Sequence, residues 1–262
     1  MNFQIAQLMS EPPVQHNIYD EFTFTEGKHS FRTFDYDIVS LFYRNNSDSR
    51  LTVFLNDAVS YSRDVANFDR LAEYSSCEGL QMYFEDSLGR KMKFIPCCYY
   101  GMLDELEIIV RRVMLDRNIR AADVTFVSAQ FGGFAASYLA EQIKGAGVVA
   151  FNPVLSVMDC FPNRARAAEF LTKFNIPADR DRKSNPKLFL SSPVSVPSTF
   201  IYHINLNDEM AMKQFKIMQK HLGIPDGNIH EGCLTFKNMS FNFHDLSAED
   251  FEEQTVNLLS GS

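Results

Sequence analysis

The chain has 262 residues, of which 45% are hydrophobic and 22% are charged. That length suits one large domain that buries about three-quarters of the surface its unfolded chain exposes. The formal net charge of −8 argues against nucleic acid as a partner, because phosphate binding needs clustered lysine and arginine. The five cysteines are odd in number and lack zinc-like spacing, which favours free thiols in a reducing compartment.

Targeting and metal-binding signals are not recognisable in the sequence. Met1 to Pro13 has no basic start followed by an apolar run, so no signal peptide is expected. No stretch approaches ~20 apolar residues, which predicts no transmembrane segment and, with the free thiols, a cytoplasmic protein. No HExxH or comparable pattern is present, so neither a metal nor another cofactor is expected.

The first half of the chain predicts an arm followed by the start of a sheet. Residues 1–35 mix polar and aromatic side chains around Pro12 and Pro13, and we expect an irregular arm or an edge hairpin there. Residues 36–262 are expected to form a single domain. The first predicted elements of that domain are strands at 36–43, 51–55 and 80–84, helices at 68–74 and 103–115, and a turn at 86–89.

The second half alternates strands with helices. Strands are predicted at 124–127, 148–151, 199–204 and 229–234, and helices at 134–143, 209–222 and 248–259, with a variable stretch at 155–195. Strands that alternate with helices of this length pair in parallel through crossovers. We therefore predict the α/β class, with a doubly wound and mostly parallel sheet.

The most informative segment follows the strand at 124–127. It reads Ser128-Ala129-Gln130-Phe131-Gly132-Gly133 and leads into a helix. A strand, a tight turn of small residues and a helix together make a nucleophile elbow, in which the pattern Gly-x-Ser-x-Gly holds its middle residue on a strained turn. Small residues are needed two positions either side because the strand and helix backbones nearly touch. Here the pattern is Ser128-x-Gln130-x-Gly132.

Residues 124–152 (VTFVSAQFGGFAASYLAEQIKGAGVVAFN) resemble the elbow region of α/β-hydrolases. They are most similar to a bacterial group involved in capsule and surface-glycan biosynthesis, which includes polysaccharide O-acetyltransferases and an accessory secretion component. Members of that group tend to have Gly-Ser-Ser-x-Gly-Gly-Phe-Ala-Ala at this point. The resemblance implies the α/β-hydrolase fold and extends more loosely over about residues 50–260.

The resemblance also implies positions for the other site residues. In this fold the chain order is nucleophile, acid, histidine. Asp208 follows the strand at 199–204, where the acid belongs, and His244 precedes the last helix, where the histidine belongs. The backbone N–H of Phe131, with one from Asn56 or Asp57, would form the oxyanion hole.

The nucleophile position departs from the family pattern. Gln130 carries an amide, which is not a usable nucleophile, so covalent acyl-enzyme chemistry at this residue is not expected. Other nucleophiles are not expected at the site either. Ser128 should lie under the turn, and nothing in the sequence places Cys97 or Cys98 near it; apolar neighbours would also raise the pKa of these thiols. An alternative without a covalent step is a His244–Asp208 dyad acting as a general base on water that Gln130 positions.

Each site residue also has a structural alternative. Gln130 could belong to a non-catalytic elbow, whose strand, turn and helix are kept because they build the fold. Asp208 fits an N-cap of the helix at 209–222, and His244 fits a surface or half-buried loop residue. His203, inside an apolar strand, fits a core histidine with a hydrogen-bond partner.

Three functions are compatible with this pattern. The first is a lapsed hydrolase that binds a glycan, an acylated small molecule or glycan, or a protein partner of a polysaccharide or secretion machinery. The second is an active esterase or O-acyltransferase on glycans that uses the His244–Asp208 dyad or a relocated nucleophile. The third is a subunit of an export or modification assembly that docks through exposed aromatics such as Tyr99 and Tyr100.

Overall fold

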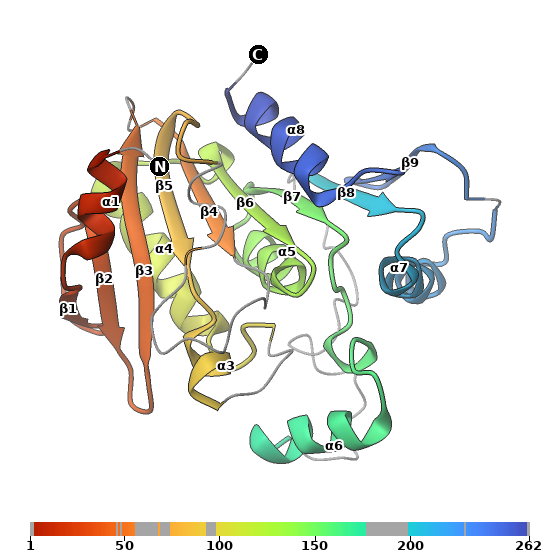
Figure 1. Ribbon diagram of the computed structural model, residues 1–262, viewed down its shortest axis with the longest axis horizontal. Coiled ribbons are helices and arrows are strands. Elements are labelled where there is room, and N and C mark those ends of the chain that lie inside the picture. Colours follow the sequence, from red (N-terminus) through yellow and green to blue (C-terminus); the bar gives the residue numbers. More distant parts are fainter. Residues whose placement is uncertain are drawn as a thin grey trace.

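The computed structural model describes residues 3–45, 47, 49–55, 68, 74–92, 98–176, 199–227 and 229–260. Within these residues one ten-stranded sheet runs through the molecule in the order β1-β2-β3-β5-β4-β6-β7-β8-β10-β9 (Figure 1). Its strands are β1 Val14–Asn17, β2 Gly27–Arg32, β3 Asp37–Asn45, β4 Leu51–Leu55, β5 Gly79–Phe84, β6 Val124–Ala129, β7 Gly147–Phe151, β8 Phe200–Asn205, β9 Gly232–Phe236 and β10 Met239–His244.

The α-helices are α1 Phe3–Ser10, α3 Ser87–Met92, α4 Leu103–Arg117, α5 Gly132–Gln142, α6 Arg164–Lys173, α7 Glu209–Leu222 and α8 Ala248–Ser260, with short 3₁₀ turns at Ala121–Asp123 and Val157–Asp159. Among the described strands there are six parallel and three antiparallel pairings. The prediction of a mostly parallel α/β sheet is confirmed. Within the described residues, no helix is long and apolar enough to cross a membrane.

Helices cover both faces of the sheet. Side chains of α4, α5 and α7, such as Leu106, Phe134 and Phe215, belong to the largest apolar cluster on one face. Val256 and Phe251 of α8 pack on the other face. Successive side chains of a strand point to opposite faces, and in β6 Phe126 accordingly joins the first cluster while Val127 joins the second.

The N-terminal residues are more regular than the arm or edge hairpin expected. They form α1, β1 and β2, and β2 pairs antiparallel with β3 while β1 pairs parallel with β2. This segment extends the same sheet at one edge, on the left in Figure 1. The apolar side chains that tie it down are Ile18, Phe24 and Phe31, which are all buried.

Most other predicted elements agree with the structure to within two residues, and the exceptions have local causes. The stretch expected as a turn at 86–89 forms α3, and the strand expected at 229–234 lies at 232–236. A tight turn with Lys237 at φ 52° then leads into β10, a strand that we did not predict. The helix expected at 68–74 falls largely outside the described residues.

Candidate functional site at the elbow

The turn between β6 and α5 has the backbone of a nucleophile elbow. Gln130 lies at its apex with φ 42°, in the left-handed region that non-glycine residues seldom adopt. Its N–H donates to Phe151 O at 2.9 Å, and its carbonyl accepts from Gly133 N at 3.0 Å and from Val154 N at 2.8 Å. The strained turn is thus fixed to β7 and the loop behind it by backbone bonds that do not depend on the side chain at 130.

Gly133 explains the small residues of the motif. A Cβ added there would lie 2.4 Å from Pro153 Cβ and 2.6 Å from Pro153 Cα. Helix α5 can therefore approach the loop after β7 only because residue 133 has no side chain. The close backbone contact that the sequence predicts around the elbow is made by this second glycine of the Gly132-Gly133 pair.

Ser128 occupies the position of the first elbow glycine. It is 4% exposed and is the last residue but one of β6, where it pairs with Leu55 of β4 and Ala150 of β7. Its Oγ makes no hydrogen bond to any described residue. Its burial agrees with the expectation that this hydroxyl lies under the turn, and no hydrogen bond to a described residue activates it as a nucleophile.

Asp208 caps α7 and is clamped by Asn152. One carboxylate oxygen accepts from Ala211 N at 2.9 Å, so the N-cap alternative is confirmed. The other oxygen accepts from Asn152 Nδ2 at 3.0 Å, while Asn152 Oδ1 accepts from Asn205 N at 2.8 Å. Asn152 itself is buried and has φ 45°.

His244 is the last residue of β10, and its ring is paired with a second histidine. His203 Nδ1 lies 3.1 Å from His244 Nε2, and the two rings stack with centroids 5.1 Å apart. His203 also packs on Phe251 of α8, at 5.5 Å between ring centroids. Burial, and then the charge of His244, lower the pKa of His203 to about 4, so it is neutral at pH 7.

The strands bring the predicted residues to one end of the sheet. Gln130, Asn152 and His244 follow or end β6, β7 and β10, and Asp208 lies three residues beyond β8. Because β6, β7, β8 and β10 are successive parallel neighbours, their carboxyl ends share an edge, where ligands bind in open α/β sheets. Yet no hydrogen bond of the described residues joins His244 to Asp208, or either of them to Gln130.

Two residues of this network, Asn152 and His203, were not assigned to the site from the sequence. Asn152 was expected only to end a strand, although a polar residue directly after an apolar strand and before Pro153 is a signal for the carboxyl edge. His203 was expected in the core. It is half-buried, and because His203 pairs with Asn242 while His244 pairs with Asn205, the two histidines are diagonal neighbours on the same face, two register positions apart.

The oxyanion-hole prediction rests on Phe131 within the described residues. Phe131 stands directly before α5, and no bond to its N–H is found in the described part of the chain. The first N–H groups of a helix have no partner within the helix, so this N–H is a donor that could serve the predicted oxyanion hole. Asn56, Asp57 and Cys97 lie outside the described residues, and Cys98 is buried.

The prediction that Tyr99 and Tyr100 are exposed docking residues is wrong for Tyr99. Tyr99 is 1% exposed and donates to Phe84 O at 2.9 Å. Tyr100 is partly buried and packs edge-on against Phe170 and Phe174 of the α6 region. Both rings therefore pack against other residues of the chain and offer little apolar surface to a partner.

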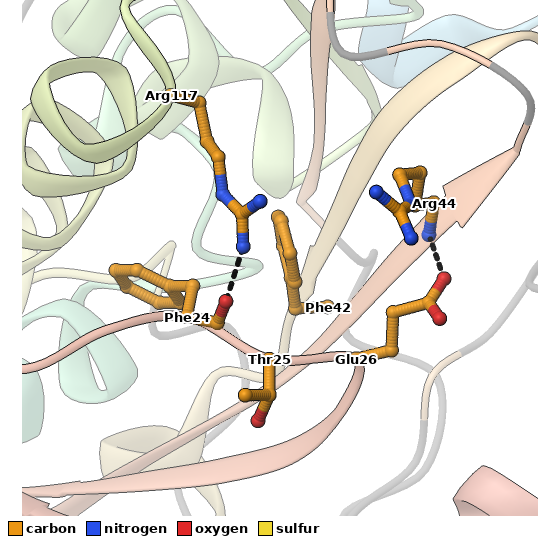
Figure 2. Close-up of a pocket in the computed structure, with 6 residues that line it drawn as sticks. All are labelled: Phe24, Thr25, Glu26, Phe42, Arg44 and Arg117. Atoms are coloured by element: carbon orange, nitrogen blue, oxygen red, sulfur yellow. Dashed lines mark hydrogen bonds between the residues drawn. The ribbon is translucent and has the colours of Figure 1, made fainter.

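A cavity of about 240 Å³ lies at the other end of the sheet, where β2 begins and β3 ends (Figure 2). Glu26 accepts there from the backbone N–H of Arg44 at 3.0 Å, and Arg117 donates to Phe24 O. These polar groups bind the protein itself, and the cavity is separate from the elbow. Within the described residues no group of three or more metal-ligating side chains occurs.

No protein-family model matches the chain, and no curated protein matches it in sequence. Solved structures match it in fold. Capsule O-acetyltransferase of Neisseria meningitidis serogroup A has a TM-score of 0.61 at 13% identity, over 90% of this chain and 96% of that one. An esterase of Thermogutta terrifontis has a TM-score of 0.55 at 13% identity, over 90% of both chains. The glycosylation associate protein complex of Streptococcus agalactiae has a TM-score of 0.54 at 12% identity, over 90% of this chain and 46% of that one.

These similarities agree with the topology and with the elbow. The parallel strands β4 to β8 and the left-handed residue between β6 and α5 are features of the α/β-hydrolase fold. The chain therefore has the α/β-hydrolase fold, and capsule O-acetyltransferase and esterases are among its structural neighbours.

Proposed function

We propose that the chain is a non-catalytic member of the α/β-hydrolase superfamily that binds an acylated or unmodified glycan as an accessory protein of surface-polysaccharide biosynthesis. The observation that carries this proposal is the state of all three triad positions. Gln130 holds the apex of the elbow without a nucleophile. Both carboxylate oxygens of Asp208 are engaged by Ala211 and Asn152, and Nε2 of His244 is engaged by His203.

The chemistry of the site supports binding over turnover. The amide of Gln130 offers one acceptor and two donor hydrogens at the position where a substrate carbonyl carbon would otherwise be attacked. The N–H of Phe131 supplies a further donor beside it. A glycan hydroxyl or ester oxygen can be held by these groups without any bond being made or broken.

The second candidate is an esterase or O-acyltransferase that uses a His244–Asp208 dyad on water. Its support is the placement of Gln130, Asp208 and His244 at the carboxyl ends of neighbouring parallel strands. Its difficulty is that a general base must lie within hydrogen-bond reach of the proton it takes, and Nε2 of His244 is already paired with His203.

Calorimetry with an O-acetylated oligosaccharide, such as acetylated xylohexaose, tests the proposal. Binding to the native protein is expected, and Gln130→Arg should abolish it because the longer cation fills the apex of the elbow. Gln142→Arg makes the same change at the exposed far end of α5 and should bind normally. Release of acetate by the native protein during the titration would favour the dyad instead.

A further inference from the structure

Two aromatic side chains stand out of the surface beside one another at the β1–β2 edge of the sheet. Phe34 is 90% exposed and Tyr19 is 53% exposed. Their ring centroids are 5.6 Å apart and their planes are inclined at 41°. The two inclined rings are both exposed to solvent. We call these two residues the Tyr19–Phe34 aromatic pair.

The turn that carries Phe34 is held rigidly. Phe34 and Asp35 form the two-residue tip between β2 and β3. Thr33 closes the turn, since its N–H and Oγ1 both donate to Tyr36 O, at 2.9 and 2.7 Å. The Tyr36 hydroxyl donates to Gly101 O at 2.7 Å, and the ammonium of Lys91 donates to Asp35 O. A ring on a fixed turn loses little conformational freedom on binding.

The turn that carries Tyr19 is held in the same way. Tyr19 N donates to Asn17 Oδ1 at 3.1 Å, and Asp20 N donates to Asn17 O at 3.0 Å. Arg112 of α4 donates to Asp20 O at 2.8 Å, and the neighbouring Ile18 is fully buried. Both rings are therefore presented outward by anchored backbone.

The aromatic pair lies at the same end of the sheet as the elbow. β2 is antiparallel to β3, which is antiparallel to β5, so β2 runs in the direction of β4 and β6. Tyr19 and Phe34 follow the carboxyl ends of β1 and β2, as Gln130 follows that of β6 (Figure 1). Four strand spacings of about 4.8 Å separate β2 from β6, roughly 19 Å along the edge.

We propose that the Tyr19–Phe34 aromatic pair is a carbohydrate-binding subsite for an uncharged stretch of the glycan chain that reaches the elbow. Sugar rings present C–H groups on their faces, which pack on aromatic rings, and hydroxyls at their edges. Exposed carboxylates of Asp20 and Asp35 supply acceptors for those hydroxyls and Arg32 supplies donors. Because the charged residues next to Tyr19 and Phe34 in sequence are of both signs, and Arg32 is paired with Asp37, the pair offers no cluster of cations to a polyanion.

The small apolar area of the pair favours a sugar over a second copy of the chain, which would have to bury further surface around the two rings. One aromatic residue buries about 150–250 Å² at most, so the pair offers no more than about 500 Å². A stable protein interface buries about 800 Å² on each partner. The inference rests on the proposed function for its choice of a glycan, but it concerns other residues.

Affinity electrophoresis of the full chain through gels that contain hydroxyethyl cellulose, xylan or galactomannan tests the proposal, with polygalacturonate as the polyanionic gel. Retardation of the native protein by a neutral polysaccharide is expected, and Phe34→Ala and Tyr19→Ala should each weaken binding about tenfold, as the loss of one stacking contact does. Phe34→Trp should retain binding. Leu115→Ala removes an apolar side chain that is 82% exposed on α4 and should change nothing.

Equal retardation of native protein and Phe34→Ala, retardation by polygalacturonate alone, or no retardation in any neutral gel would overturn the subsite. So would a dimer in sedimentation that Phe34→Ala dissociates. Gln130→Arg separates the two proposals. If it abolishes binding of the acetylated oligosaccharide while Phe34→Ala leaves gel retardation intact, the elbow proposal stands and the subsite fails. The reverse pattern sinks the elbow proposal and keeps the subsite.

Discussion

The two halves of the candidate site differ in how closely they follow a hydrolase. The elbow between β6 and α5 keeps its strained backbone, because Gln130 has φ 42° and its N–H and C=O are bonded to Phe151, Gly133 and Val154. The acid and histidine positions keep their place in the fold but have other hydrogen-bond partners, Asn152 for Asp208 and His203 for His244. The backbone of the elbow thus has the hydrolase geometry, whereas the side chains of Asp208 and His244 are hydrogen-bonded to residues outside the predicted triad.

The largest expected effect tests the rigidity of the elbow. Gly133→Ala places a Cβ against the backbone and ring of Pro153, so α5 or the following loop must move. We expect a loss of about 3 kcal/mol in the free energy of unfolding, measured by urea denaturation. Gly227→Ala, where nothing lies within 4 Å of the added Cβ, is the control and should change stability little. Similar stability of the two variants would mean that the elbow is loosely packed.

The acid position should show a structural loss of intermediate size. Asp208→Ala removes both the cap of α7 and the acceptor for Asn152, and we expect about 2 kcal/mol of destabilisation by urea denaturation. Asp208→Asn keeps an oxygen for Ala211 N and should cost less than half as much. If both variants are as stable as the native protein, Asp208 does not stabilise the fold through α7 or Asn152, and this result would favour the His244–Asp208 dyad.

His203, the hydrogen-bond partner of His244, should make stability depend on pH. The pKa of His203 is lowered to about 4, so the folded state keeps this ring neutral while the unfolded chain takes up a proton below about pH 6.5. The unfolded state then binds more protons, and stability must fall as pH drops from about 6.5 to about 4. His203→Phe should reduce this fall between urea denaturation near pH 7 and near pH 5.

His29 adds a second pH dependence of stability, which remains when His203 is replaced. Burial first lowers its pKa, also to about 4. Its Nδ1 lies 2.8 Å from His16 Nε2, and its Nε2 lies 2.7 Å from Thr25 O. It contributes a fall in stability of the same sign over the same range, so His203→Phe should weaken the pH dependence without abolishing it. An unchanged slope would show that His203 is not buried as described.

The smallest expected effect concerns strain at the apex. A non-glycine residue in the left-handed region costs about 1 kcal/mol, so Gln130→Gly should stabilise the protein by up to about that amount. Gln130→Ser should be nearly neutral in the same thermal or urea denaturation. Destabilisation by glycine would show that the Gln130 side chain has packing or hydrogen-bonding partners that hold the turn.

The fold was largely predictable because its signals are local. Short apolar strands such as Leu51–Leu55 and the helix Glu209–Leu222 agree with the predicted bounds, and the Gln130 elbow has small residues at the required spacing. β10 was missed although Met239, Phe241 and Phe243 alternate and are buried, because its turn contains no glycine. The histidine pair was not predictable, since it depends on the register between β8 and β10 and not on sequence spacing.

The site illustrates the same limit. The resemblance to α/β-hydrolases implied positions for Gln130, Asp208 and His244, and the structure has all three at the carboxyl edge of the sheet. Hydrogen-bond partners depend on a few ångströms of side-chain position. Asn152 and His203 reach Asp208 and His244 by distances of 3.0 and 3.1 Å, which no residue pattern specifies.

Ester turnover is the most direct test of the claim that this site does not catalyse. Native protein, His244→Ala and Gln130→Ser would be compared on p-nitrophenyl acetate and on an O-acetylated oligosaccharide, with a fluorophosphonate probe to detect a reactive serine. The account predicts that native protein matches His244→Ala on both substrates and takes up no label. It also predicts that Gln130→Ser gains less activity alone than when combined with His203→Phe, which releases His244 Nε2. Turnover by native protein that His244→Ala abolishes would contradict it.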